Sequence, residues 1–157
     1  MDTRSSAAEI KQQMQIVINV KGLPIAQPRH RAACRGGFPK MYIPKDHAVH
    51  AWKKSVMSAA AQVTDVTIEG AIKVDCLFVF PSPKSKKSQT GNYKFSKPDI
   101  DNLLKAIFDA LTDVSLWADD SQVVEIHSAK MYGDDPCAII RVEAVDFNVT
   151  NDAVETK

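Results

Sequence analysis

Apolar residues recur along this chain with two different periods: every second residue in some segments, and every three to four residues in others. Apolar residues at every second position predict a strand over residues 16–20 and another over residues 71–80. The second strand is expected to be half exposed at its start and buried on both faces at its end. Between the two, apolar residues at helical spacing predict a helix from an N-cap at Asp46 to about Val63.

The most regular helical pattern follows Pro98. This proline cannot donate a hydrogen bond and disfavours helical geometry at Lys97, so it fixes a helix start near this point. Asp99 is the expected N-cap, with Asp101 in the first turn, where the helix dipole favours negative charge. The apolar side chains of this helix fall on one continuous stripe: Ile100, Leu103, Leu104, Ile107, Phe108 and Leu111.

Two further strands, over residues 122–131 and 137–146, are predicted near the C-terminus. The turn-rich sequence 133–136 favours a hairpin between them. Residues 24–44 are basic and rich in glycine and proline, which predicts an irregular segment outside the core. A lysine-rich loop separates the strand at 71–80 from the helix that follows Pro98.

Taken in order, these elements predict an α/β (α+β) fold over residues 1–157. We expect a single domain with a mixed sheet in β-α-β-α-β-β order and with the helices packed on the sheet. Residues 1–14 are expected to form a flexible arm and residues 147–157 a loose tail.

Composition agrees with one globular domain. The chain has 157 residues, of which 45% are hydrophobic and 25% charged. No apolar run approaches the roughly 20 residues that cross a bilayer, and the polar N-terminus does not resemble a secretory signal. A cytoplasmic protein without a membrane partner is therefore expected. The three cysteines form no CxxC pair, so the sequence does not indicate a zinc ribbon or a disulfide framework.

The net charge of +1 hides a strong asymmetry between the two parts of the chain. Residues 1–97 carry 16 Lys and Arg against 6 Asp and Glu, whereas residues 98–157 carry 4 against 13. A basic part can attract a polyanion while an acidic part holds a metal. Eight basic residues in the two loops are candidate DNA contacts: Arg29, Arg31, Arg35, Lys84, Lys86, Lys87, Lys94 and Lys97.

The acids near the second helix suit a hard cation. Asp99 and Asp101 stand at the helix start, and Asp119 and Asp120 follow a short loop beyond its end. Aspartates without a histidine or thiolate partner favour Mg²⁺, with Mn²⁺ as a possible substitute. Such a metal can polarise a phosphodiester, and Lys105 at the next turn can stabilise charge in the transition state.

Structural roles for the same residues stay open. Asp99 can be only an N-cap, Asp101 a first-turn acid paired with Lys105, and Asp119 and Asp120 a turn before a strand. Two other functions also stay open: a branched-DNA-binding protein without nuclease activity, and a metal-dependent phosphohydrolase of small nucleotides. The last lacks support from a phosphate-binding glycine motif.

The block DIDNLLKAIFDALTDVSLWADDSQVVE, residues 99–125, resembles the RusA family of Holliday junction resolvases. It covers about a sixth of the chain. The shared pattern is Asp-x-Asp-Asn, a lysine four positions after the second Asp, and Trp-x-Asp-Asp before a strand. The family comprises small metal-dependent endonucleases of bacteria and prophages with a mixed α/β fold, which act in DNA recombination and repair. They act as homodimers that cut two opposed strands of a four-way junction.

The resemblance implies roles for individual residues. Asp99, Asp101 and Asp120 are then the metal-binding catalytic acids and Lys105 the catalytic lysine. Asn102 is expected to support the helix start. One departure concerns the residues just before Asp99, where the family type member has arginines and this chain has Phe-Ser-Lys-Pro. That difference bears on junction selectivity and cleavage preference more than on metal chemistry.

Overall fold

The structure is a computed structural model that describes residues 15–85 and 89–145. The predicted arm at residues 1–14, the predicted tail at residues 147–157, and the candidate DNA contacts Lys86 and Lys87 lie outside the described residues. None of the helices in the described part of the chain is long and apolar enough to cross a membrane.

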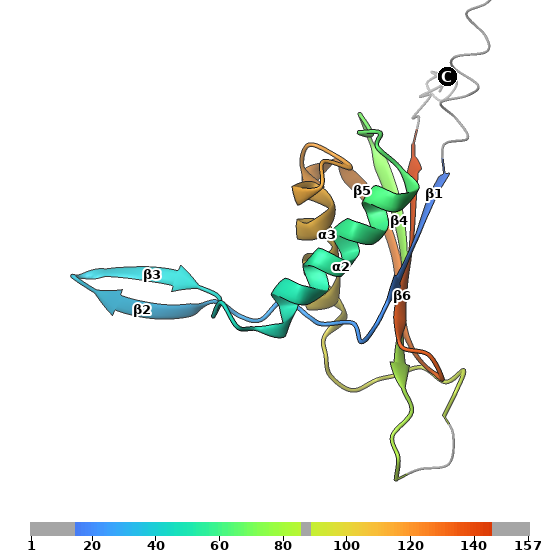
Figure 1. Cartoon of the computed structure of the whole chain (residues 1–157), viewed down its shortest axis with the longest axis horizontal. Helices are drawn as coiled ribbons and strands as arrows, with labels where there is room; N and C mark the ends of the chain where they lie inside the picture. The colour runs from blue at the N-terminus through green and yellow to red at the C-terminus, as the bar shows by residue number, and fades with distance from the viewer. Residues whose placement is uncertain (1–14, 86–88, 146–157) are drawn as a thin grey trace, which may run out of the picture.

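A four-stranded mixed sheet forms the body of the protein, with two helices on one of its faces (Figure 1). The strands lie in the order β1-β6-β4-β5; β4 and β5 are parallel, and the other two pairs are antiparallel. The strands of this sheet are β1 (Gln15–Lys21), β4 (Ile72–Pro81), β5 (Val123–Gly133) and β6 (Cys137–Ala144). The helices are α2 (Ala48–Val63) and α3 (Ile100–Asp113). The predicted fold class is confirmed, and the elements of this body follow one another in the predicted order.

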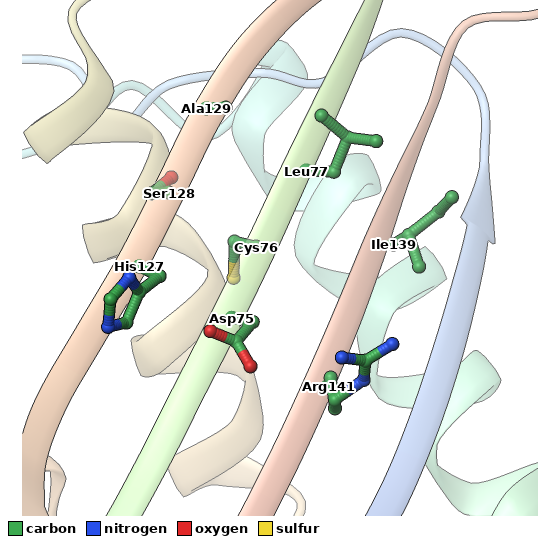
Figure 2. A pocket seen from close by; sticks show the side chains of 8 residues that line it. All are labelled: Asp75, Cys76, Leu77, His127, Ser128, Ala129, Ile139 and Arg141. Atoms are coloured by element: carbon green, nitrogen blue, oxygen red, sulfur yellow. The ribbon is translucent and has the colours of Figure 1, made fainter.

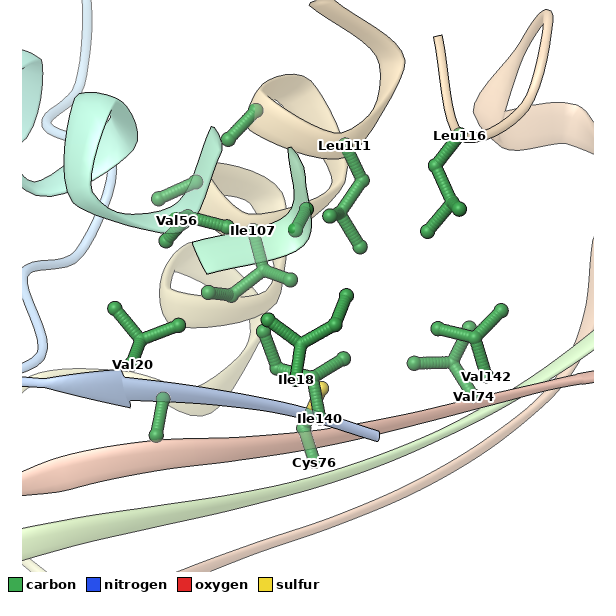
Figure 3. Packing of buried hydrophobic residues seen from close by; sticks show 14 of the residues in the cluster. Ile18, Val20, Val56, Val74, Cys76, Ile107, Leu111, Leu116, Ile140 and Val142 are labelled. Atoms are coloured by element: carbon green, nitrogen blue, oxygen red, sulfur yellow. The ribbon is translucent and has the colours of Figure 1, made fainter. Parts of the chain in front are cut away.

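The core lies between the sheet and the two helices. Every second residue of β1, β4 and β6 points toward the helices, as Ile18, Ile140 and Val142 do in Figure 3. From the other side, α2 contributes Trp52 and α3 contributes Ile107. Trp52 and Trp117 are both buried. This layer is apolar throughout, so its burial is the main stabilising term of the fold.

Three local predictions were wrong. The N-cap of α2 is His47, whose ring Nδ1 accepts a hydrogen bond of 3.1 Å from the Val49 backbone N–H, so the helix starts one position later than an Asp46 cap would place it. The end of β4 is not buried on both faces, because its residues alternate between buried and half-buried positions up to Phe80. The outward-facing residues of this strand lie on the sheet face opposite α2 and α3.

The third correction concerns the C-terminal strands, which do not form a hairpin. β6 lies between β1 and β4, whereas β5 lies on the far side of β4 and runs parallel to it. The reason is burial: β6 presents three fully buried apolar residues and occupies the centre, while the first residues of β5 are largely exposed and suit an edge. Gly133 is the last residue of β5 that pairs with β4. A side chain does not fit at this position, because a Cβ would lie only 2.6 Å from Val79 Cγ1.

Residues 24–44 are outside the core, as predicted, but they are not wholly irregular. They contain a second, two-stranded sheet formed by β2 (Arg31–Arg35) and β3 (Phe38–Tyr42). Gly36 and Gly37 form the turn, with φ angles of 70° and 84°, a combination that suits a tight hairpin because glycine adopts positive φ without strain. We call residues 31–42 the ribbon; it extends away from the body (Figure 1).

Candidate active site

The start of α3 presents two acids to solvent. Asp99 is the N-cap and Asp101 lies in the first turn, as predicted, and both are exposed. The Asp99 side chain makes no capping hydrogen bond. Neither carboxylate has a hydrogen bond or an ion pair with any residue of 15–85 or 89–145, so their oxygen atoms are available to a ligand. The structure therefore does not support a purely structural capping role for Asp99.

Backbone contacts hold this helix start from two sides. The Nζ of Lys130 in β5 donates hydrogen bonds to the carbonyls of Ser96 and Pro98, at 2.8 Å and 2.6 Å. On the other side, the Gln27 N–H donates to the Asn102 backbone carbonyl at 2.8 Å. No sequence pattern singles out Lys130, because a lysine within a strand normally points to solvent.

The lysine-rich loop is partly ordered by β5. Its residues 91–94 run along the outer edge of β5, where the Lys94 N–H donates to the Lys130 carbonyl at 2.9 Å and the Tyr132 N–H to the Asn92 carbonyl at 2.9 Å. The Lys94 ammonium lies 5.5 Å from the Phe80 ring centroid and 5.3 Å from that of Tyr132. These contacts fix the path of the chain toward Asp99.

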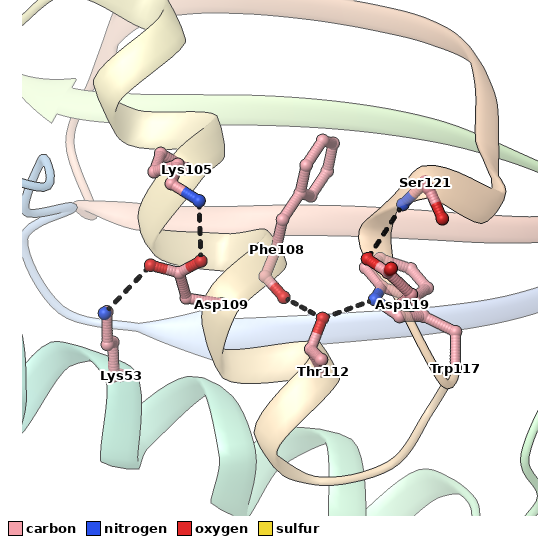
Figure 4. A network of polar contacts seen from close by, with 8 residues as sticks. All are labelled: Lys53, Lys105, Phe108, Asp109, Thr112, Trp117, Asp119 and Ser121. Atoms are coloured by element: carbon pink, nitrogen blue, oxygen red, sulfur yellow. Dashed lines mark hydrogen bonds and ion pairs between the residues drawn. The ribbon is translucent and has the colours of Figure 1, made fainter.

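Lys105 lies on α3 one helical turn after Asp101. Its Nζ donates to Asp109 Oδ1 at 3.1 Å, while Lys53 of α2 approaches the other oxygen of Asp109 at 3.2 Å (Figure 4). The hydrogen bond to Asp109 raises the pKa of Lys105, and the nearby Asp120 carboxylate adds to this effect. Lys105 is therefore a cation at neutral pH, and its observed carboxylate partner is Asp109.

A loop that folds back along α3 positions Asp120. The Trp117 ring is fully buried and packs edge-on against Phe108, with ring centroids 5.8 Å apart. Its Nε1 donates to Thr112 Oγ1 at 2.7 Å, and the Thr112 hydroxyl donates to the Phe108 carbonyl at 2.9 Å (Figure 4). Asp120 is the first residue of the short 3-10 helix η1 (Asp120–Gln122), three positions after this anchor.

Asp119 and Asp120 have different surroundings. Asp119 is the N-cap of η1, where its carboxylate accepts a hydrogen bond from the Ser121 N–H at 3.2 Å, and Gln122 completes the capping box. Hydrogen bonds from Ser121, followed by one from Asp120, lower the pKa of Asp119. Asp119 thus has a structural role at the turn. Asp120 is half-buried, and its charge helps to raise the pKa of Lys105.

The structure brings the predicted acids to one flank of α3 without closing a cage around a cation. Among residues 15–85 and 89–145, no three His, Cys, Asp or Glu side chains stand close enough together to hold a metal ion. Mg²⁺ usually keeps several waters and uses one or two carboxylates together with the phosphate of a substrate. The exposed oxygen donors of Asp99 and Asp101 fit that mode of binding.

The described candidate DNA contacts lie on two separate segments of the chain. Arg29 and Arg31 are exposed beside and within the ribbon, and Lys84 and Lys97 are exposed in the lysine-rich loop. Lys94 is half-buried on the two aromatic rings. Arg35 belongs to β2, where its backbone pairs with that of Phe38.

A separate hollow lies on the sheet face away from the helices (Figure 2). Asp75, His127 and Arg141 stand over a floor that includes Leu77 and Ile139. Burial, aided by the Asp75 charge, raises the pKa of the adjacent Cys76 to about 12, so its thiol stays protonated and is a poor nucleophile. The acids at α3 lie on the other side of the sheet and take no part in this hollow.

Comparison with known proteins identifies a family and several relatives. The family described as endodeoxyribonuclease RusA matches residues 21–143. The uncharacterized protein YqaN of Bacillus subtilis (strain 168) is 32% identical over 140 residues, which cover 83% of this chain and 96% of that protein.

A shorter and more similar stretch matches the crossover junction endodeoxyribonuclease RusA of Escherichia coli (strain K12), at 58% identity over 33 residues. That stretch covers 21% of this chain and 28% of the relative. The relative of the same name from Enterobacteria phage 82 gives the same identity and the same coverage. Since the family match extends over both helices and three of the four strands of the central sheet, the chain belongs to the RusA family of endodeoxyribonucleases.

Proposed function

We propose that this protein is a Mg²⁺-dependent endonuclease that resolves four-way DNA junctions, acting as a homodimer in DNA recombination and repair. The observation that carries the proposal is the pair of exposed carboxylates, Asp99 and Asp101, at the start of α3, with the Lys105 ammonium one turn further on. A two-fold dimer presents two equivalent sites to a nearly two-fold substrate, which suits paired cuts. The proposal places the protein in the cytoplasm of a bacterial or phage-infected cell, where junction DNA is found.

Each part of the flank has a task in this proposal. Asp99, Asp101 and Asp120 hold the cation, which when bound would polarise the scissile phosphate and lower the pKa of a bound water. Lys105, kept protonated and oriented by Asp109, stabilises the extra negative charge on the phosphate in the transition state. Lys130 and the loop anchored by Trp117 fix the two ends of the flank.

The exposed basic residues supply binding. Arg29 and Arg31 on one side, and Lys84 and Lys97 on the other, contact phosphates, and the half-buried Lys94 orders the loop that carries Lys97. Arg35, Lys86 and Lys87 complete this set in the proposal. Phosphate contacts of this kind make affinity fall steeply with salt concentration.

The test is cleavage of a mobile four-way junction beside a matched linear duplex, in Mg²⁺, in Mn²⁺ and in EDTA. Symmetric nicks in the junction, lost in EDTA, support the proposal. Asp101→Asn should retain junction binding and lower cleavage by at least about 100-fold, because it removes a metal ligand and not a DNA contact. Asp113→Asn makes the same charge change on an exposed residue at the far end of α3 and should cleave normally.

Two outcomes would contradict the proposal. Tight junction binding without cleavage in either metal would identify a branched-DNA-binding protein instead of a nuclease. Equal loss of binding and cleavage in Asp101→Asn would show that this acid has another role.

A further inference from the structure

The ribbon has no packing role in the body. Its strands pair with each other, and within the described residues neither strand joins the four-stranded sheet. All five residues of β3 are exposed, including Phe38 at 82%, Met41 at 61% and Tyr42 at 46% of their full accessible area. An isolated two-stranded hairpin is only marginally stable in water. A partner that covers the ribbon would therefore both order it and remove these apolar side chains from water.

The charge of this region selects the class of partner. From Lys21 to Lys45 the chain carries six Lys and Arg and no Asp or Glu. An uninterrupted positive segment of this kind favours a polyanion. A two-stranded ribbon also has a width that the DNA major groove admits.

The strand register sorts the ribbon into two unlike faces. Arg31 pairs with Tyr42 and Ala33 pairs with Lys40, and side chains two positions apart share a face. Arg31, Phe38, Lys40 and Tyr42 therefore lie on one face together with Ala33. The opposite face carries only uncharged residues: Ala32, Cys34, Pro39 and Met41. Basic and aromatic side chains are thus combined on a single surface, as in proteins that bind phosphates and stack on bases.

The tip of the ribbon is narrow. Gly36 and Gly37 carry no side chains, and a Cβ built at either position would meet no atom within 4 Å. Phe38 is the first side chain after this turn and is the most exposed aromatic residue of the ribbon. Proteins that kink DNA insert apolar side chains such as Phe between base steps and partially unstack them. In the open form of a four-way junction, the terminal base pair of each arm lacks a stacking neighbour on one side, so inserting a ring there costs less than in duplex DNA.

We propose that the ribbon is a junction-reading arm whose basic-aromatic face lies on DNA and whose Phe38 ring stacks on a base at the branch point. This inference rests on the proposed function, since it takes branched DNA as the substrate. Arg31 and Lys40 contact phosphates on any DNA, whereas Phe38 distinguishes a branched molecule from a linear one. Phe38 is therefore a specificity-determining residue and takes no part in the chemistry at α3.

The experiment uses a four-way junction with 2-aminopurine next to the branch point, titrated with the full-length protein in EDTA. The wild type should change the 2-aminopurine fluorescence on binding. Phe38→Ala should lose most of that change and weaken junction affinity roughly tenfold, without weakening linear duplex binding. Phe38→Trp keeps an aromatic ring and should retain both. Val17→Ala removes exposed apolar surface from β1, far from the ribbon, and should behave as the wild type.

Arg31→Gln and Lys40→Gln provide the complementary comparison. Each should weaken junction and duplex binding equally and reduce the slope of log affinity against log salt by about 0.9. The inference is overturned if Phe38→Ala matches the wild type in fluorescence and affinity, or if it weakens duplex and junction to the same extent. DNA binding that is unaffected by every ribbon variant would also overturn it and would favour an acidic protein as the partner.

Cleavage in Mg²⁺ is scored separately. Suppose that the wild type nicks junctions and that Phe38→Ala gives the same fluorescence change on binding as the wild type. The proposed function would then stand and the inference would be removed. A branch-point signal that depends on Phe38, in a protein that does not cleave, would do the reverse.

Discussion

Two pairs of antiparallel strands in this molecule, β1–β6 in the body and β2–β3 in the ribbon, differ in what they bury. In β6, Ala138, Ile140 and Val142 are fully inaccessible to solvent, whereas every residue of β3 is exposed. The apolar residues of the body are explained by folding, because removing them from water stabilises the domain. Those of the ribbon contribute nothing comparable to the core, and the proposed contact with DNA would account for their presence. Exposed aromatic residues beside basic residues therefore indicate a candidate binding surface, whereas buried aromatic residues belong to the core that stabilises the fold.

The largest expected contrast concerns single aromatic residues in the two regions. Trp117→Ala should lower the free energy of unfolding by about 3–5 kcal/mol, because it empties a fully buried site and removes the anchor of the Asp120 loop. Phe38→Ala should change the same quantity by less than about 0.5 kcal/mol. Urea denaturation of both variants measures the two values. A destabilisation of similar size in Phe38→Ala would mean that the ribbon packs on the body.

Removal of the whole ribbon tests the same contrast through binding. Since Arg31 and Tyr42 are cross-strand partners, residues 31–42 can be replaced by Gly-Gly without separating residues 30 and 43. Junction affinity should fall at least tenfold, about 1.4 kcal/mol, while unfolding of the body stays within about 0.5 kcal/mol of the wild type. The salt dependence should also decrease by roughly two to three counterions. Filter binding over a salt series, together with urea denaturation, checks both parts.

At saturating protein this deletion variant should still cleave in Mg²⁺, because the acids of α3 are untouched. Loss of folding on deletion would contradict the separation of ribbon and body.

A single hydrogen bond in the body should matter more to stability than any ribbon side chain. Thr112→Val keeps the shape of the side chain but leaves the Trp117 Nε1 without its acceptor. A buried donor without a partner costs about 1–3 kcal/mol, and the Asp120 loop should loosen with it. Thermal unfolding and junction cleavage both report the change. Thr112→Ser retains the hydroxyl and serves as the control; an equal loss in both variants would assign the effect to packing.

The smallest predicted effect is a shift in the titration of Lys105. Asp109 raises the pKa of this lysine, so Asp109→Asn should lower it toward the ordinary value of 10.5. The stabilisation from this pair is complete below 10.5 and is lost as the pH rises through the folded-state pKa. It is small, since the Lys105 side chain is 53% exposed. NMR titration of ¹³Cε-labelled lysine gives the pKa directly.

Lys53→Met is the matched control for this titration. It removes the second cation at Asp109 but leaves the Lys105–Asp109 hydrogen bond, so the pKa of Lys105 should stay raised. An unchanged titration of Lys105 in Asp109→Asn would show that another group sets its pKa.

Periodicity in the sequence was enough to determine the scaffold. The alternating residues of β1 and β4 and the apolar stripe of α3 were predicted correctly, because each element buries one face and its spacing records that face. The positions of Asp99 and Asp101 at the helix start also followed from local signals, since Pro98 disfavours helical geometry before it. The family resemblance rested on the same local block of residues.

Only the tertiary structure decided which distant segments meet. Strand pairing depends on competition for the central position of the sheet, so a turn-rich sequence after β5 did not reveal that β6 pairs with β1 and β4. The contact of Lys53 in α2 with Asp109 and the contact of Lys130 with the start of α3 likewise depend on packing between elements. The ribbon was not predicted because its residues bury no face. Strands are predicted from the alternation of buried and exposed residues, which this segment lacks. Only the pairing of β2 with β3 defines these two strands.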